Sequence, residues 1–159
     1  MARRTKPVPP GHHTVTPYLI VGDAASALEF YQTAFGAHEL MRVPAPQGRI
    51  GHAEIRIGDS VIMLADEHPE INARSPQSLG GSPVSIHLYV EDVDAVTDLA
   101  IAAGATVLRP VKDQFYGDRS GTVADPFGHI WHIATHKEDL TPDELHKRVA
   151  AAMAQHGAD

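Results

Sequence analysis

The strongest constraint on this chain is an internal duplication. Residues 15–37 (VTPYLIVGDAASALEFYQTAFGA) match residues 84–105 (VSIHLYVEDVDAVTDLAIAAGA), with one gap before the glycine near the end. At the original offset, residues 60–66 (SVIMLAD) match residues 129–135 (HIWHIAT). Matched pairs include Val15 with Val84, Leu19 with Leu88, Val21 with Val90 and Asp23 with Asp92. The chain is therefore predicted to contain two copies of one supersecondary unit that share a core.

Each copy is predicted to combine one helix with four short strands, in the order βαβββ. β-Branched and aromatic residues indicate an opening strand in each copy, and Asp23 and Asp92 are good N-caps for the helices that follow. The inward stripe of the second helix is predicted to be Val93, Val96, Leu99 and Ala103. The predicted strands are 18–21, 38–44, 51–57 and 60–66, then 86–90, 106–111, 120–125 and 129–135. The fold class is therefore α+β.

The regions around the two copies complete the predicted domain organisation. Pro- and Gly-rich stretches without periodicity predict a disordered arm and a linker, and the capping box from Thr141 to Glu144 predicts a terminal helix. The predicted boundaries are 1–13 for the arm, 14–66 and 84–136 for the modules of one domain at 14–138, 67–83 for the linker, and 139–159 for the C-terminal helix and tail.

Charge and composition exclude several classes of partner. The chain has 159 residues and a formal net charge of −7, which disfavours binding to nucleic acid or to anionic lipid. The absence of cysteine removes disulfides, thiolate nucleophiles and cysteine metal ligands. Because the N-terminal segment lacks the apolar stretch of a secretory signal, and no apolar run could span a bilayer, a cytoplasmic protein is expected.

Three histidines in ADPFGHIWHIATH raise the question of a metal site. In a helix, His129, His132 and His136 would share one face. The duplication instead predicts a strand after the turn DPFG, so His129 and His132 point to opposite faces. His136 shares the face of His132 but lies roughly 13 Å further along the strand. The three histidines are therefore not expected to form a site by themselves.

Strand alternation predicts one apolar and one polar face for each sheet. The apolar face, under the helices, receives Leu19, Val21, Ala53, Ile55, Ile57, Ile62, Leu64, Ile86, Leu88, Val90, Trp131 and Ile133. The opposite face mixes polar groups with aromatic rings and a thioether, which is typical of a ligand cavity, although a solvated sheet surface is the alternative. The predicted ligand-binding residues are Tyr18, His52, Glu54, Met63, His87, Tyr89 and His132 on the strands, with Tyr116 and Arg119 in a rim loop. Arg119 is expected either to bind an anionic group or to pair with Asp118 or Asp125.

Three segments are similar to the vicinal oxygen chelate superfamily, specifically its PhnB-type glyoxalase/bleomycin-resistance-like branch. They are VTPYLIVGDAASALEFYQTAFGA, GHAEIRIGDSVIML and YGDRSGTVADPFGHIWHIATH, and the resemblance covers residues 14–138. It implies that the two βαβββ modules form an eight-stranded, cup-shaped mixed sheet. It also implies a homodimer.

The resemblance further implies where a metal would bind. The superfamily's ligands carry over to Thr16, Met63, Ser85 and His132, of which only His132 is a suitable donor. No metal or other cofactor is therefore expected, and no catalytic residue is assigned. The alternative is zinc or nickel bound by a rearranged set comprising His52, Glu54, His87 and His132.

Two main functions follow from these expectations. The first is binding of a small organic ligand in the concave cavity without the usual glyoxalase metal site. The alternative is a metal-dependent, glyoxalase-like lyase or isomerase. A third hypothesis is an accessory protein whose terminal helix binds a partner through Leu145, Val149 and Met153.

The dimer implied by the resemblance can be tested directly. Light scattering at micromolar protein concentration is expected to return the mass of two chains. A monomer would remove the dimer and leave the predicted fold unchanged, because no residue pattern used for the fold depends on association.

Overall fold

The computed structural model describes residues 5–157, which form two compact units. The first unit contains the chain up to Pro83 together with Pro126–His129. The second contains Val84–Asp125 and the chain from Ile130 onward. Residues 1–4 of the predicted arm, including Arg3 and Arg4, lie outside the described residues.

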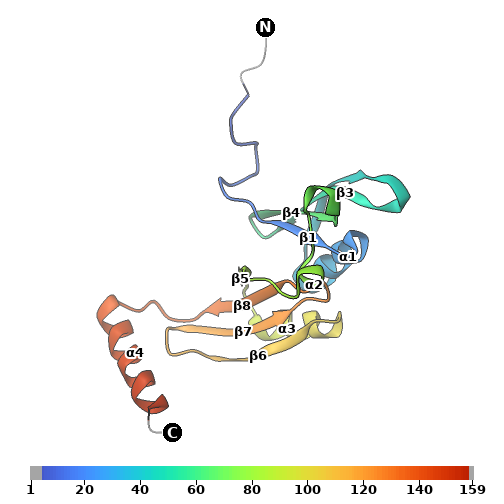
Figure 1. The fold of residues 1–159 in the computed structure, drawn as a ribbon. Coiled ribbons are helices and arrows are strands. Elements are labelled where there is room, and N and C mark those ends of the chain that lie inside the picture. The colour runs from blue at the N-terminus through green and yellow to red at the C-terminus, as the bar shows by residue number, and fades with distance from the viewer. Residues whose placement is uncertain (1–4, 158–159) are drawn as a thin grey trace. The chain divides into compact units, whose positions relative to one another are not determined.

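The first unit is a four-stranded mixed sheet with one helix packed on it (Figure 1). The strand order is β1-β4-β3-β2, in which β1 pairs with β4 in parallel and the other pairs are antiparallel. Its elements are β1 (Tyr18–Val21), α1 (Ala24–Phe35), β2 (His38–Pro44), η1 (Pro46–Gly48), β3 (Ile50–Ile57), β4 (Ser60–Asp66), η2 (Pro69–Ile71) and α2 (Pro76–Leu79).

The second unit repeats this topology with the order β5-β8-β7-β6. Its elements are β5 (Ser85–Tyr89), α3 (Val93–Ala102), β6 (Thr106–Asp113), β7 (Asp118–Ala124), β8 (Ile130–His136) and α4 (Pro142–His156). Strand β5 pairs with β8 in parallel, as β1 pairs with β4. The α+β class, the two βαβββ modules, the eight strands and the C-terminal helix are confirmed, with the strands arranged as two four-stranded sheets.

Helix α1 begins and ends where its sequence predicts. The Asp23 side chain accepts a hydrogen bond from the Ser26 amide at 3.1 Å, and Gly36 ends the helix in the left-handed conformation, which glycine adopts without steric cost. Between these caps, the helix buries seven apolar residues against the sheet: Ala24, Ala27, Leu28, Phe30, Tyr31, Ala34 and Phe35. Phe127 from the turn before β8 packs against Phe30 and Tyr31 and extends this core.

Helix α3 presents a different face to its sheet from the one predicted. Asp92 caps the helix as expected, through a 3.0 Å hydrogen bond from the Ala95 amide. However, its buried residues are Val93, Thr97 and Ala100, whereas Leu99 is 50% exposed. The predicted stripe was therefore wrong at Leu99, because the smaller Thr97 and Ala100 side chains occupy the contact with the sheet.

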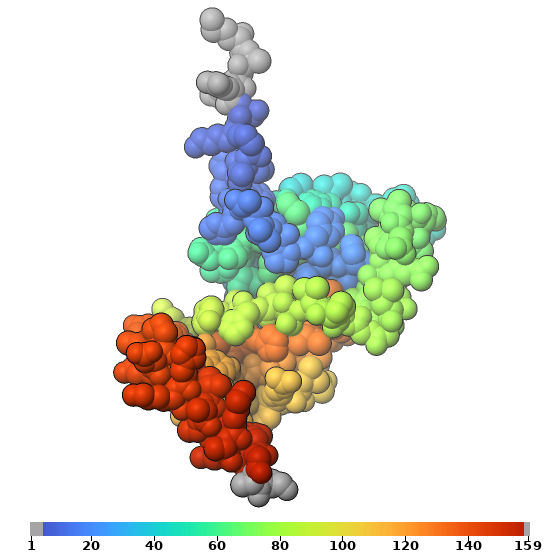
Figure 2. Space-filling model, turned by 60° about the vertical axis from the view of Figure 1, so that its left-hand side comes forward, coloured from blue at the N-terminus to red at the C-terminus, as the bar shows by residue number. Residues whose placement is uncertain are grey.

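Helix α4 has the predicted capping box but buries none of its residues. Thr141 Oγ1 accepts from the Glu144 amide, and Glu144 Oε2 accepts from the Thr141 amide. In the space-filling view the helix (red) is exposed at the surface of the second unit (Figure 2). Arg148 ties its first half to the preceding segment through Glu138 Oε2, at 2.6 Å. No helix within residues 5–157 is long and apolar enough to cross a membrane.

The segment between the modules contains short helices where only a loop was predicted. Pro69–Ile71 form a 3-10 turn and Pro76–Leu79 a single α-helical turn capped by Ser75. Glu67 accepts hydrogen bonds from the Ser75 amide and the Ser78 hydroxyl. Hydrogen bonds from these serines lower the pKa of Glu67 to about 2. This carboxylate therefore organises the segment in its ionised form.

The apolar core of the first sheet gives a test of the fold. Leu64, on β4, is 0% exposed, whereas Leu40, on the edge strand β2, is 42% exposed. Leu64→Ala is expected to lower the free energy of unfolding by about 2–5 kcal/mol, because it leaves a cavity in a packed core. Leu40→Ala should lower it by under about 1 kcal/mol in the same urea titration. Equal losses would contradict the strand register described here.

Candidate ligand-binding site

The duplicated register places corresponding residues in a row across the polar face of each sheet. In the first unit, strand pairing aligns Tyr18, Met63, Glu54 and Met41. In the second unit it aligns His87, His132, Thr122 and Arg109. Both rows are read in the order first, fourth, third and second strand of the module. Seven of the nine predicted site residues lie in these rows or beside them on the same strands, with four in the first unit and three in the second.

The polar face of the first sheet carries a chain of hydrogen bonds centred on His52. Its Nδ1 lies 2.8 Å from the hydroxyl of Tyr18, and its Nε2 lies 3.2 Å from Glu54 Oε1. A carboxylate can only accept, so Nε2 of His52 donates to Glu54, and in the tautomer protonated at Nε2 the Nδ1 atom accepts from the hydroxyl of Tyr18. Burial, with a smaller contribution from Glu54, raises the pKa of Tyr18. Tyr18 is therefore held as a neutral phenol.

Sequence reasoning missed His12, which joins this cluster from the N-terminal segment. Its Nε2 lies 3.5 Å from Glu54 Oε2, and its side chain is only 16% exposed. Next to it, His13 Nε2 lies 3.0 Å from the carbonyl of Asp59. Gly11 also approaches the Arg56 guanidinium closely. Residues 11–13 therefore lie along the β3–β4 hairpin, a contact between distant segments that no local sequence pattern signals.

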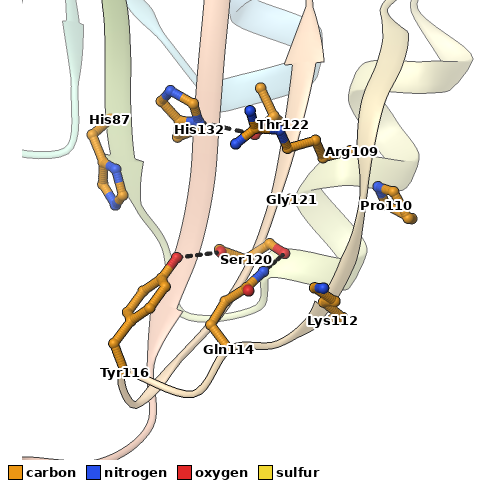
Figure 3. Close-up of a pocket in the computed structure, with 10 residues that line it drawn as sticks. All are labelled: His87, Arg109, Pro110, Lys112, Gln114, Tyr116, Ser120, Gly121, Thr122 and His132. Atoms are coloured by element: carbon orange, nitrogen blue, oxygen red, sulfur yellow. Dashed lines mark hydrogen bonds between the residues drawn. The ribbon is translucent and has the colours of Figure 1, made fainter. Parts of the chain in front are cut away.

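The polar face of the second sheet is hollowed into a cavity of about 510 Å³ (Figure 3). That volume is within the range of small-molecule sites, roughly 300–1,000 Å³. Its walls come from β5, β6, β7, β8 and the loop before β7. The lining residues are His87, Arg109, Pro110, Lys112, Gln114, Tyr116, Ser120, Gly121, Thr122 and His132.

His132 occupies the centre of the second row and has a hydrogen-bonding partner at each ring nitrogen. Nδ1 lies 2.9 Å from Thr122 Oγ1, and Nε2 lies 3.0 Å from Ser85 Oγ. The ring of His87 lies beside it, with 5.9 Å between the centroids. Burial, then the nearby His87 and Arg109, lower the pKa of His132. His132 is therefore a neutral, fixed wall of the cavity at neutral pH.

Two β-bulges bring Arg109 and Lys112 to the cavity. In a regular strand Arg109 would share the face of Val107, which pairs with the fully buried Val123. The register shifts between Val107 and Arg109, and again before Lys112, so that these cations lie opposite Thr122 and Ser120. Neither cation was predicted as a site residue. The available signal was Pro110, since proline within a strand indicates an edge strand or a bulge.

Gly121 lets the bulged strand approach β7. A Cβ at this position would lie 2.8 Å from Val111 Cγ2, closer than Cβ atoms come to other atoms, and 3.1 Å from the Val111 amide nitrogen, so that β6 would have to shift. Only glycine therefore permits the local spacing of β6 and β7 at the floor of the cavity.

Three predicted site residues of the second unit lie at different distances from this cavity. Tyr116 lines it, with its hydroxyl 3.3 Å from Ser120 Oγ. Tyr89 lies outside the lining and is 63% exposed, but its ring is 4.7 Å from that of His87. Arg119 lies on the other face of β7. Side chains alternate along a strand, and the cavity side is taken by its neighbour Ser120 and by Thr122.

Arg119 is bound by two carboxylates that the sequence analysis did not consider. Its Nε and Nη2 donate to Asp94 at 2.8 and 2.9 Å, and Nη1 donates to Asp113 at 3.2 Å. The expected pairing with Asp118 or Asp125 was therefore wrong. The partners come from α3 and the end of β6, and identifying them required the register of β6 and the direction of its bulges.

The three histidines of the DPFGHIWHIATH stretch have separate environments, as alternation predicts. His129 lies before β8 and its Nε2 is 2.9 Å from the carbonyl of Ile20. His132 lines the cavity. His136 lies between Asp118 and Asp139, at 2.7 and 2.8 Å.

The residues at the superfamily's metal positions do not fit a transition metal. Thr16 and Ser85 offer hydroxyls and Met63 a thioether, which are poor donors for zinc, nickel or iron. The only imidazole, His132, has both nitrogens within hydrogen-bonding distance of hydroxyls. Across residues 5–157, no group of three or more His, Asp or Glu side chains is arranged to hold a metal ion. The rearranged set divides between the units, with His52 and Glu54 in the first and His87 and His132 in the second.

Comparison with known proteins identifies the family. The profile of the Glyoxalase/Bleomycin resistance protein/Dioxygenase superfamily matches residues 11–133, so the chain belongs to that superfamily. The uncharacterized protein Rv0887c of Mycobacterium tuberculosis is 47% identical over 146 residues, covering 90% of this chain and 84% of that protein.

Solved structures agree with this assignment. TioX from Micromonospora sp. ML1 is 27% identical, with a TM-score of 0.60 over 78% of this chain and 98% of that one. The PhnB protein from Bacillus cereus is 18% identical, with a TM-score of 0.61 over 77% of this chain and 99% of that one. This second likeness is one of fold alone.

The pKa values of His132 and His136, both on β8, should be shifted in opposite directions. Hydrogen bonds to Asp139 and Asp118 raise the pKa of His136, whereas burial lowers that of His132. NMR titration of the ring protons should therefore place His136 above the usual value of about 6.5 and His132 below it. Asp139→Asn should lower the pKa of His136 and leave that of His132 unchanged. The opposite order of the two histidines would contradict the described contacts.

Proposed function

We propose that this protein binds a small organic molecule in the cavity on the polar face of the second sheet. The observation that carries the proposal is the cavity itself. It is of ligand size, and its polar side chains converge from four strands of one sheet. A solvated sheet surface would not need a hydrogen-bonded imidazole, hydroxyls and an amide drawn together around one hollow.

The chemistry of the walls suits binding better than metal-dependent catalysis. His132 is neutral and fixed by two hydroxyls, and Gln114 and Tyr116 are held by contacts to Ser120. Such groups orient a ligand through hydrogen bonds, while the rings of Tyr116 and His87, which both line the cavity, offer flat surfaces to a ring or chain. We therefore propose binding without the glyoxalase metal site.

The glyoxalase-like lyase or isomerase is the competing function, and elemental analysis separates the two. Untagged protein purified without added metal should contain well under one equivalent of nickel, zinc or iron. A stoichiometric metal that survives dialysis would overturn the metal-free proposal and support the set that includes His52 and Glu54. The homodimer and the cytoplasmic location stay predictions.

Substitution of one wall residue tests where the ligand sits. A screen of small cyclic organic compounds, both neutral and charged, should yield binders that shift the NMR resonances of β7 and β8. His132→Ala should weaken such a binder several-fold, because a net hydrogen bond is worth about 1 kcal/mol and Thr122 and Ser85 lose their fixed partner.

His129→Ala is the matched control for this measurement. It removes an imidazole three residues away whose partner is the carbonyl of Ile20 in the first unit. Titration calorimetry should show unchanged affinity for any variant that remains folded by circular dichroism. Equal losses from the two variants, or a screen without binders at the cavity, would refute the proposed site.

A further inference from the structure

We infer that the ligands of this cavity are organic anions whose acidic group is held by Arg109 and Lys112. The inference rests on the proposed function and adds the chemical class of the ligand. Its basis is the charge of the cavity walls and the backbone geometry that puts two cations on them.

The walls of the cavity are positively charged although the protein as a whole is acidic. The ten lining residues include an arginine and a lysine but no aspartate or glutamate. Within residues 5–157, neither Arg109 nor Lys112 makes an ion pair with a carboxylate. In a chain with 20 acidic and 13 basic residues, a hollow with only cations at its walls indicates an anionic occupant.

Arg119 shows what a structural arginine looks like in the same sheet. Its guanidinium is bracketed by Asp94 and Asp113, and it stands on the face of β7 that points away from the cavity. Among the described residues no carboxylate pairs with Arg109, and Figure 3 shows its guanidinium turned toward His132 and Thr122. A guanidinium presents a planar fork of donors that matches carboxylate and phosphate oxygens.

The bulges in β6 place Arg109 and Lys112 on the same face of the strand. Arg109 and Lys112 are three positions apart in the sequence, and in a regular strand their side chains would point to opposite faces. The register shift between them moves both cations to the cavity face, opposite Thr122 and Ser120. Bulges are frequent beside functional sites, where they redirect a side chain, and this one costs regular pairing with β7.

The size of the cavity and its other lining residues indicate what the uncharged part of the ligand is like. A cavity of about 510 Å³ is much larger than a bare phosphate or acetate ion needs. The rings of His87 and Tyr116 border it, and the amide of Gln114 is a further polar contact. The class that fits these walls is an organic carboxylate or phosphate with a flat, ring-containing body.

The pH dependence separates arginine and lysine from histidine as the source of positive charge. The titratable groups at the cavity are His87 on β5, His132 on β8, Arg109 and Lys112 on β6, and Tyr116 before β7. Model lysine and arginine side chains stay charged to about pH 10 and beyond, whereas histidine is neutral well above about pH 6.5. Binding of an anion should therefore persist at pH 8.

The test uses 2-naphthoate, the isosteric amide 2-naphthamide, and inorganic phosphate, each titrated into the full chain at pH 8 and followed by NMR and calorimetry. Naphthoate should bind at the cavity at least about tenfold more tightly than naphthamide. Arg109→Gln and Lys112→Gln should each weaken naphthoate about tenfold or more, since a hydrogen bond to a charged group contributes about 1.5–3 kcal/mol. Arg109→Lys should lose less, and phosphate should compete with naphthoate.

Arg119→Gln is the control, because it removes the same charge from the other face of the sheet. It should leave naphthoate affinity within twofold once circular dichroism shows a folded protein. The inference is overturned if naphthoate and naphthamide bind equally, if Arg119→Gln matches Arg109→Gln, or if naphthoate produces no shifts on β6 to β8. In each case neutral binders found at the cavity would leave the proposed function standing.

Discussion

The pairing of the first and last strands of each module is the constraint on which the rest of the structure depends. Leu19 pairs with Leu64 in one sheet and Leu88 with Ile133 in the other, in the same parallel register. Because side chains alternate along a strand, these apolar pairs fix which residues face the helices. A slip of one residue would bury His132 under α3 and expose Ile133. The same strand register therefore determines both the hydrophobic core and the polar face.

The duplication also preserves a backbone irregularity. In β2, the register shifts between Glu39 and Met41, and in β6 it shifts between Val107 and Arg109. The two bulges occupy the same place in their modules. Each brings the residue after the shift, Met41 or Arg109, onto the polar face. In the first unit that residue is a methionine, and in the second it is an arginine. The same bulge therefore positions an apolar side chain in the first module and a cationic side chain in the second.

Much of the fold could be predicted from the sequence, because alternation and capping are local properties. Asp23, Gly36 and Thr141 fix helix ends through contacts within one turn, and Ala53 and Ile55 signal their face by spacing alone. The bulges were not predictable in this way, since they depend on how β6 pairs with β7. Cavity-lining residues on regular strands, such as His132, could therefore be assigned to the polar face from the sequence, whereas the positions of Arg109 and Lys112 could not. His12 was missed because its contact spans more than forty residues.

The same scaffold has acquired opposite charge chemistry in its two copies. Glu54 and Thr122 occupy corresponding positions on the third strand, and Met63 and His132 on the fourth. In the first unit, the carboxylate of Glu54 sets the tautomer of His52, so the charge is used within the protein. In the second unit, a neutral hydroxyl stands at that position and satisfies His132 without any charge. Within residues 5–157, neither Arg109 nor Lys112 on β6 forms an ion pair with a carboxylate. The charge of the two faces therefore differs at two places in their rows: a carboxylate is matched by a hydroxyl on the third strand, and a methionine by an arginine on the second.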